Sequence, residues 1–141
     1  MILNLQNIYK DYQQDKLVVP VLKDVCLTVE EGEYVAIMGE SGSGKTTLLN
    51  ILAALDQPTD GEVILNGKKL QSVREKEIAA FRRKHLGFVF QDFNLLDNFN
   101  LRDNIYLPLV LSDTKYAEME ARLEPLAKKL GISQLLDKFP Y

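Results

Sequence analysis

The stretch Gly39-Glu-Ser-Gly-Ser-Gly-Lys-Thr-Thr47 decides the fold, because it matches the phosphate-binding loop pattern G-x-x-x-x-G-K-[ST]. An apolar run, Tyr34–Met38, precedes it and predicts a central strand that is buried on both faces. Leucines at helical spacing follow it, from Leu48 to Leu55, and predict a helix that ends before Pro58. The order of strand, glycine-rich loop and helix predicts an α/β protein that binds phosphate groups.

Each part of this loop has a chemical task. Glycines at positions 39, 42 and 44 allow backbone N–H groups to surround an anion in conformations that a Cβ would obstruct. The following helix adds the partial positive charge of its N-terminal end. Lys45 would reach the β- and γ-phosphates of a nucleotide, and the Thr46 hydroxyl would bind Mg²⁺. A nucleoside kinase, a GTPase, a helicase-type ATPase and a transporter ATPase all remain possible at this point.

Composition restricts the class of protein further. The 141 residues are 46% hydrophobic and 26% charged, which favours one globular core and excludes a disordered or collagen-like chain. The single Cys26 cannot form an internal disulfide, and no Cys/His cluster has metal-binding spacing. A net charge of −3 argues against nucleic acid as a partner. The longest apolar stretch, residues 105–111, is far shorter than the roughly 18 residues of a membrane-spanning helix, so we expect a soluble cytoplasmic chain without membrane insertion.

Hydrophobic alternation predicts further strands on both sides of the loop. Apolar residues alternate with polar ones at Leu3 and Leu5 and again over Val25–Val29, which predicts two strands, with the polar run 11–16 as the loop between them. Val63 and Leu65 predict another strand, closed by a tight turn at Asn66-Gly67.

Helix signals dominate the second half of the chain. Ser72 with Glu75 matches a capping box and predicts the start of a helix that Gly87 ends. Phe88–Phe90 predicts a short buried strand, which stops at Gln91.

Two more helices are predicted beyond Gln91. Asn100 should cap a helix that runs towards Leu111. Apolar residues between Met119 and Leu130 predict another, which Pro125 should kink or break near Arg122.

Several stretches together resemble the ATP-binding subunits of ABC transporters. The resemblance runs from Asn7 to Tyr141, and it is carried by Ile8–Tyr12, Val21–Val25, the loop Gly39–Thr47, Leu55-Asp56, Pro58–Gly61 and Gly87–Leu95. The chain is most similar to the bacterial subgroup that serves macrolide export, lipoprotein release and resistance to bacitracin-like peptide antibiotics.

The resemblance implies an α/β P-loop NTPase fold of the ABC ATPase type, of which this chain holds only the N-terminal part. That part comprises an antiparallel β segment, the core strand with its P-loop and helix, and the start of the helical subdomain. Residues 1–92 would be the N-terminal part of the ATP-binding core, and residues 93–141 the Q-loop continuation with a partial helical subdomain.

The resemblance also implies roles for individual residues. Tyr12 would stack on adenine, with Tyr9 as the rival, and Gln91 would be the Q-loop glutamine that touches Mg²⁺ and the attacking water. Lys45 and Gln91 would be the catalytic residues, and Thr46 and Gln91 the ligands of Mg²⁺. The remaining contacts to ATP would come from the loop residues Gly39, Glu40, Ser41, Gly42, Ser43, Gly44, Lys45, Thr46 and Thr47. Glu40 departs from the family, which has a small residue or proline at that place.

The expected partners follow from the same resemblance. ATP and Mg²⁺ would be the cofactors, a second ATP-binding subunit would complete a homodimer, and a transmembrane permease would hold the subunit at the inner face of the membrane. The apolar side chains Phe93, Leu95, Leu96, Phe99 and Leu101 would either meet this permease or pack inside the helical subdomain. Both alternatives can hold for different residues.

The 141 residues do not contain the signature motif, the catalytic glutamate or the switch histidine of the family. We therefore expect an N-terminal fragment of a longer protein, which should bind Mg-ATP weakly without hydrolysing it. The expected core strand Val35–Met38 would lack neighbours and leave an exposed apolar edge. The alternatives are a non-catalytic nucleotide-binding module and a small stand-alone P-loop kinase.

Overall fold

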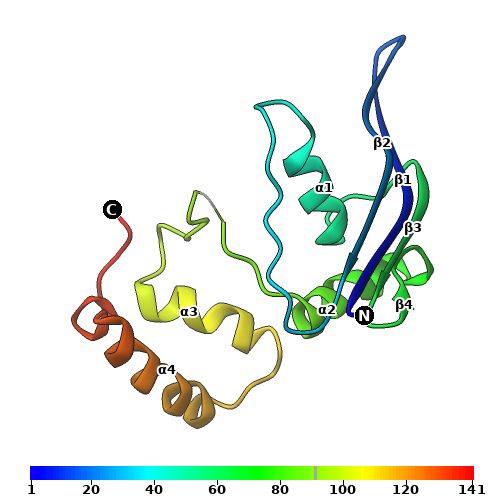
Figure 1. Cartoon of the computed structure of the whole chain (residues 1–141). Coiled ribbons are helices and arrows are strands. Elements are labelled where there is room, and N and C mark those ends of the chain that lie inside the picture. The colour runs from blue at the N-terminus through cyan, green and yellow to red at the C-terminus, as the bar shows by residue number, and fades with distance from the viewer. Residues whose placement is uncertain (91) are drawn as a thin grey trace. The chain divides into compact units, whose positions relative to one another are not determined.

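The computed structural model describes residues 1–90 and 92–141. Within it the chain forms two compact units, Met1–Leu86 and Gly87–Tyr141, each of which has its own hydrophobic core. Figure 1 shows the helices and strands of both units.

The first unit is built on a four-stranded antiparallel sheet with the order β2-β1-β3-β4. Its strands are β1 (Leu3–Gln14), β2 (Leu17–Val29), β3 (Asp60–Leu65) and β4 (Lys68–Lys69). Strands were expected at the start of β1 and the end of β2, but the predicted loop over residues 11–16 is wrong. The ladder continues to Gln14, and only Asp15 and Lys16 form the turn. Backbone groups make the ladder, so polar side chains that face solvent do not interrupt it.

The turn between β3 and β4 confirms the tight turn predicted at Asn66-Gly67. Both residues have positive φ, +50° and +73°, and Leu65 pairs with Lys68 across them. Two residues in this conformation form a turn whose twist matches that of the strands.

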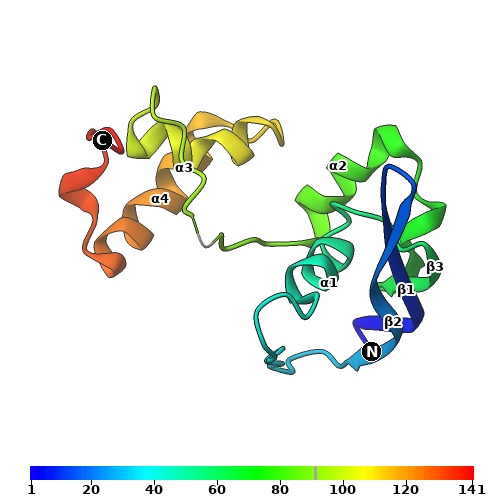
Figure 2. The same cartoon turned by 90° about the horizontal axis from the view of Figure 1, so that it is seen from above.

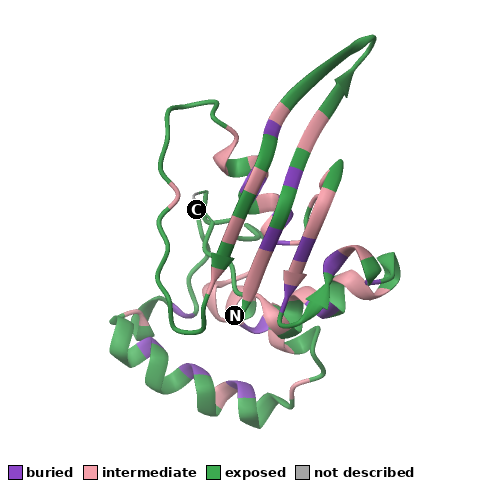
Figure 3. Ribbon diagram, turned by 45° about the vertical axis from the view of Figure 1, so that its right-hand side comes forward, coloured by how far each residue is buried: buried purple, intermediate pink, exposed green. Residues whose placement is uncertain are grey.

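Helix α1 (Lys45–Leu52) packs its buried residues Leu48 and Ile51 against the sheet (Figure 1, Figure 2). It is shorter than predicted, because Ala54 has φ +53° and the left-handed conformation ends the helix before Leu55. The core of this unit also includes Leu5, Ile8 and Val63, which are among its most deeply buried side chains. Buried positions are separated by exposed ones in β1 and by a half-buried one in β3 (Figure 3).

Helix α2 (Glu75–His85) follows the single-turn helix η1 (Leu70–Ser72) and buries Phe81. The predicted capping box is wrong, since Arg74 is the N-cap and makes no side-chain capping bond. Ser72 lies inside η1, where its hydroxyl donates to the carbonyl oxygen of Lys69 at 2.6 Å. A serine hydroxyl bonded backwards in this way is not the acceptor that a capping box needs.

Two apolar runs that predict buried strands do not form them. Tyr34 and Met38 are 96% and 89% exposed, Val89 is fully exposed, and neither Tyr34–Met38 nor Phe88–Phe90 pairs with any segment among the described residues. A strand buried on both faces needs a ladder on each side as well as an apolar sequence. The run Tyr34–Met38 is largely exposed and lacks neighbours, as expected, but it forms no strand and therefore no strand edge.

The second unit consists of α3 (Leu101–Val110), α4 (Tyr116–Leu130) and the short helix η2 (Ser133–Leu135). Its core contains five buried residues: Tyr106, Met119, Leu123, Ala127 and Leu136. The predicted N-cap is confirmed, since the Asn100 side chain accepts the N–H of Asp103 at 2.8 Å. No helix among the described residues has the length and apolar character needed to cross a membrane.

Helix α4 passes through Pro125 without the predicted break. Proline removes the bond to the carbonyl of Ala121. Both residues are exposed, so water can bind that carbonyl. The helix ends at Gly131, which has φ +69° in the left-handed conformation, as its glycine and preceding lysines indicate.

One carboxylate joins the two helices of this unit. Glu120 on α4 accepts hydrogen bonds from Arg102 at 2.8 Å and from the hydroxyls of Tyr106 at 3.0 Å and Tyr116 at 3.1 Å. Arg102 also lies 3.5 Å from a carboxylate oxygen of Asp137. The polar cluster therefore ties α3, α4 and the C-terminal segment together.

Candidate functional site

The predicted phosphate-binding loop leads directly into α1. Gly44 is the N-cap with φ +89°, and Gly42 has φ +80°, so both occupy the left-handed region that glycine tolerates best. The N–H of Ser43 donates to the carbonyl of Glu40 at 3.3 Å, which turns the loop back on itself. The first N–H groups of α1 therefore lie next to a tight, glycine-containing loop, where they can donate hydrogen bonds to an anion.

Gly44 also allows the loop to approach strand β2. A Cβ at this position would lie 3.0 Å from Leu22 Cδ2 and 3.1 Å from Val21 Cγ1, tighter than ordinary contacts. Two independent requirements, the positive φ and the close approach, thus select glycine here. The contact fixes the start of α1 against the sheet.

Lys45 lies across the loop. Its ammonium donates to the carbonyls of Gly39 at 2.7 Å and Glu40 at 2.5 Å, and more weakly to the hydroxyl of Ser43 at 3.3 Å. Three of the residues predicted to contact ATP, Gly39, Glu40 and Ser43, therefore surround the ammonium group of Lys45. The longest bond, to Ser43, is the one that an incoming phosphate oxygen could replace most easily.

An open hollow lies beside this charge. It is lined by Val21, Ser41, Gly42, Gly44, Lys45, Thr46 and Thr47. The structure thus brings the nine predicted loop residues together, six lining the hollow and three bonded to Lys45. The Thr46 side chain is exposed in the first turn of α1, where its hydroxyl is accessible to a cation shared with a phosphate.

Tyr12 lies within β1 and not on a loop after it, which corrects the expected placement. It pairs with Val19 and is 40% exposed. Its hydroxyl donates to Asp56 Oδ2 at 2.8 Å, and Lys10 Nζ lies 4.8 Å from the centroid of its ring. The rival Tyr9 is three positions away along the strand, and side chains three apart point to opposite faces.

Lys10 and Asp56 form an ion pair that the sequence reading missed. Lys10 Nζ lies 2.7 Å from Asp56 Oδ1 and 2.7 Å from the carbonyl of Gln57. Partial burial alone would raise the pKa of Asp56, but hydrogen bonds from Lys10, Tyr12 and the N–H of Gln57, with the Lys10 charge, hold it below its ordinary value. One signal was available: Lys10 and Tyr12 are two residues apart, so a strand puts them on one face.

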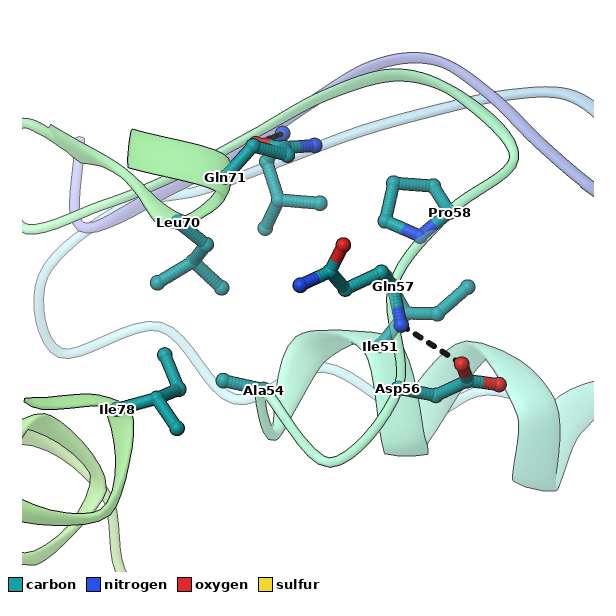
Figure 4. A pocket seen from close by; sticks show the side chains of 9 residues that line it. Ile51, Ala54, Asp56, Gln57, Pro58, Leu70, Gln71 and Ile78 are labelled. Atoms are coloured by element: carbon teal, nitrogen blue, oxygen red, sulfur yellow. Dashed lines mark hydrogen bonds between the residues drawn. The ribbon is translucent and has the colours of Figure 1, made fainter. Parts of the chain in front are cut away.

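The cavity beside Asp56 is a different feature, shown in Figure 4. It holds about 30 Å³ and is lined mainly by apolar side chains, including Ile51, Leu70 and Ile78, with Gln57 reaching into it. Gln71 is bonded to the backbone of β3, donating to the carbonyl of Gly61 at 3.2 Å. This volume has room for one water-sized group, so the hollow at the loop remains the candidate site.

The predicted Q-loop glutamine, Gln91, lies outside the described residues. Of the apolar side chains after it, Phe93, Leu95 and Leu96 are exposed, while Phe99 is half-buried and Leu101 packs against the core of the second unit. Internal packing thus holds for Leu101, while contact of the exposed side chains with a permease stays a prediction.

Residues 22–141 match the family model described as ABC transporter. The chain belongs to the ABC transporter family. The match covers the loop, α1 and the whole second unit, so the predicted family is confirmed. In this ABC chain the loop 39–47 lies inside the matched residues, and its role in binding phosphate stays a prediction.

Curated relatives agree along the whole chain. The protein named "Uncharacterized ABC transporter ATP-binding protein YvcR" of Bacillus subtilis is 50% identical, and the match covers 99% of this chain and 55% of that protein. The "Bacitracin export ATP-binding protein BceA" of Halalkalibacterium halodurans is 43% identical, with 99% of this chain and 55% of that protein covered. The ABC chain thus spans about half the length of the curated relatives it matches.

A solved structure gives the same fold. The ATP-binding cassette MJ0796, in a dimeric post-hydrolysis state bound to ADP and Pi, is 36% identical with a TM-score of 0.89. The match covers 99% of this chain and 62% of that one. The prediction of a partial α/β cassette of the ABC ATPase type is confirmed.

Proposed function

We propose that this chain is the ATP-binding part of the ATPase subunit of a bacterial ABC exporter, and that loop 39–47 holds the phosphates of ATP. One observation carries the proposal: the ammonium of Lys45 lies at the centre of the loop, beside the open start of α1. Positive charge and free N–H groups in one hollow favour a polyphosphate.

The loop residues also fit Mg²⁺. Lys45 would contact the β- and γ-phosphates, while the Thr46 hydroxyl would supply one ligand to an Mg²⁺ ion shared with phosphate oxygens. Mg²⁺ in nucleotide sites takes few protein ligands, so one hydroxyl in an open hollow is compatible with it. The bound ion would screen the phosphate charge, and Glu40 is exposed, so its carboxylate can remain in solvent.

Tyr12 would bind the base and Gln91 would orient the attacking water. The half-exposed ring of Tyr12 supports the first role, since an aromatic face stacks on any base. The assignment of Gln91 rests on the sequence resemblance alone. The division of labour between residues 1–92, as the nucleotide core, and residues 93–141, as the Q-loop continuation and partial helical subdomain, belongs to the same proposal.

The whole protein would pair with a second copy and with a permease at the inner face of the membrane. The dimeric state of the MJ0796 cassette supports the second copy, and the bacitracin export for which BceA is named supports a peptide antibiotic as the exported substrate. The permease rests on the sequence resemblance. The 141 residues should bind Mg-ATP but not hydrolyse it, because they lack the glutamate that the family uses to polarise water.

The test compares Lys45→Ala with the wild type in equilibrium binding of Mg-ATP. We expect the affinity to fall at least about tenfold, since the central charge of the loop is removed. Lys76→Ala, on the exposed surface of α2, is the matched control and should bind like the wild type. Equal ATP affinity of Lys45→Ala and wild type would overturn the phosphate site. Hydrolysis by the wild type that Lys45→Ala abolishes would instead contradict the expected lack of turnover.

A further inference from the structure

We propose that Asp56 is a positioning residue for the base of the nucleotide, acting through the hydroxyl of Tyr12. The inference rests on the proposed function, in which ATP lies on the loop and Tyr12 stacks on its base. Asp56 itself would touch neither the base nor the phosphates.

Both carboxylate oxygens of Asp56 are occupied in fixed directions. Oδ2 accepts the hydroxyl of Tyr12 at 2.8 Å, and Oδ1 accepts the ammonium of Lys10 and the N–H of Gln57, both at 2.7 Å. The Lys10 side chain is only 11% exposed, so its position is restricted by packing as well as by the ion pair. A carboxylate held at three points offers Tyr12 an acceptor in one place.

The ring of Tyr12 is restricted at two points. Asp56 binds the hydroxyl at its tip, while Lys10 Nζ lies 4.8 Å from the ring centroid and so occupies one face. A base can then stack only on the other face. A side chain that is already ordered loses less conformational entropy when its ligand binds.

This ring lies on the same face of the β1–β2 hairpin as the phosphate loop. Lys10 and Tyr12 alternate along β1 and pair with Leu22 and Val19 of β2. Leu22 belongs to the core and lies against Gly44 at the start of α1. The pairing shifts register between these two pairs, so Val19 and Leu22 share a face although they are three positions apart. That separation is about 10 Å or less, which one nucleotide can bridge.

Asp56 also has a structural role that the test must separate. It joins the segment after α1 to β1, as do the bonds from Thr59 N to the Tyr9 carbonyl at 2.8 Å and from Asp11 N to Thr59 Oγ1 at 2.9 Å. A general loosening of this junction would weaken the binding of every ligand. Positioning of Tyr12 would weaken only ligands that carry a base.

The experiment measures the affinities of the full chain for Mg-ATP and for inorganic triphosphate with Mg²⁺. In Asp56→Ala and in Tyr12→Phe we expect ATP to bind about three- to tenfold more weakly, with the affinity for triphosphate unchanged. The double variant should be no worse than either single one, because both remove the same hydrogen bond. Tyr9→Phe, a tyrosine on the opposite face of the same strand, is the matched control and should change neither affinity.

The outcomes separate this inference from the proposed function. Failure of the wild type to bind either ligand would overturn the phosphate site itself. Unchanged ATP affinity in Tyr12→Phe, additive losses in the double variant, or equal losses for ATP and triphosphate in Asp56→Ala would each overturn the positioning role while leaving the phosphate site in place.

Discussion

The two units of the chain are held together in different ways. In Met1–Leu86, strand β1 pairs with β2 and with β3, which follows it by more than forty residues, and the core joins side chains from Leu5 to Phe81. In Gly87–Tyr141, consecutive helices enclose a small core, and one carboxylate, Glu120, joins them. The stability of the first unit depends on close pairing between backbone segments. The stability of the second depends on contacts between side chains of neighbouring helices.

The two units should therefore differ in which substitutions destabilise them, and the candidate site lies in only one of them. The nine loop residues and Tyr12 all belong to the first unit, where the loop touches β2 through a glycine. A single added methyl group should therefore damage the first unit most. In the second unit, the removal of a side chain should have the larger effect.

The largest effect is expected for Gly61→Ala in the first unit. Gly61 has φ +93°, and a Cβ there would overlap the carbonyl oxygen of Asn7 and lie 2.6 Å from that of Gln6. Backbone atoms cannot move away without disturbing the sheet. The free energy of unfolding of this unit should therefore fall by about 3 kcal/mol or more. Gly67→Ala, with φ +73° and open space, should cost about 1 kcal/mol. Denaturant titration followed by hydrogen exchange over β1 and β3 measures both, and equal costs would contradict the backbone account.

The second unit should respond most to loss of a core side chain. Leu123→Ala removes a side chain that is 5% exposed, and it should destabilise α3 and α4 by about 2–4 kcal/mol. Leu126→Ala, on the same helix but 56% exposed, should change stability by less than about 0.5 kcal/mol. Hydrogen exchange should quicken in both helices of Leu123→Ala while β1–β3 keep their protection. Joint loss of protection in both units would show that they do not unfold separately.

Local signals predicted the features that depend on neighbouring residues. The loop Gly39–Thr47, the turn at Asn66-Gly67 and the cap at Asn100 each need only a few adjacent residues to form, and the structure has all three conformations. The capping box at Ser72 matched the same kind of signal and failed. The Ser72 hydroxyl instead donates to the carbonyl of Lys69, three residues earlier. Both bonds involve only nearby residues, so the sequence alone does not tell which of them forms.

Features that depend on residues far apart in the chain could not be predicted from the sequence. The runs Tyr34–Met38 and Phe88–Phe90 have the composition of buried strands, but burial depends on pairing partners that composition does not reveal. Likewise, Lys10 and Asp56 are 46 residues apart and meet only because the segment after α1 packs against β1. The need for glycine at position 61 arises from the approach of β3 to β1 and has no local signature.

A smaller effect is expected from the cap of α3. Asn100→Ala removes the acceptor of the Asp103 N–H and should destabilise the second unit by about 1 kcal/mol. Asn98→Ala, two residues earlier and exposed, is the control and should be nearly neutral. Thermal unfolding with hydrogen exchange over residues 101–110 measures the difference. Equal exchange rates in the two variants would mean that the Asn100 side chain does not stabilise the start of α3.

The smallest effect is expected from the charge of Glu120. Hydrogen bonds from Tyr106 and Tyr116, and then the nearby Arg102, hold the pKa of Glu120 below its ordinary value of 4.5. A lowered pKa in the folded state stabilises the fold above that ordinary value, and the contribution disappears as the pH falls through the folded pKa. The second unit should therefore lose protection as the pH falls from about 4.5 through the lower pKa of the folded state, and Glu120→Gln should flatten this dependence. Asp56 has a lowered pKa as well, so exchange in β1 should keep its own pH dependence in Glu120→Gln. An equally steep pH dependence of α3 and α4 in wild type and Glu120→Gln would show that another group carries it.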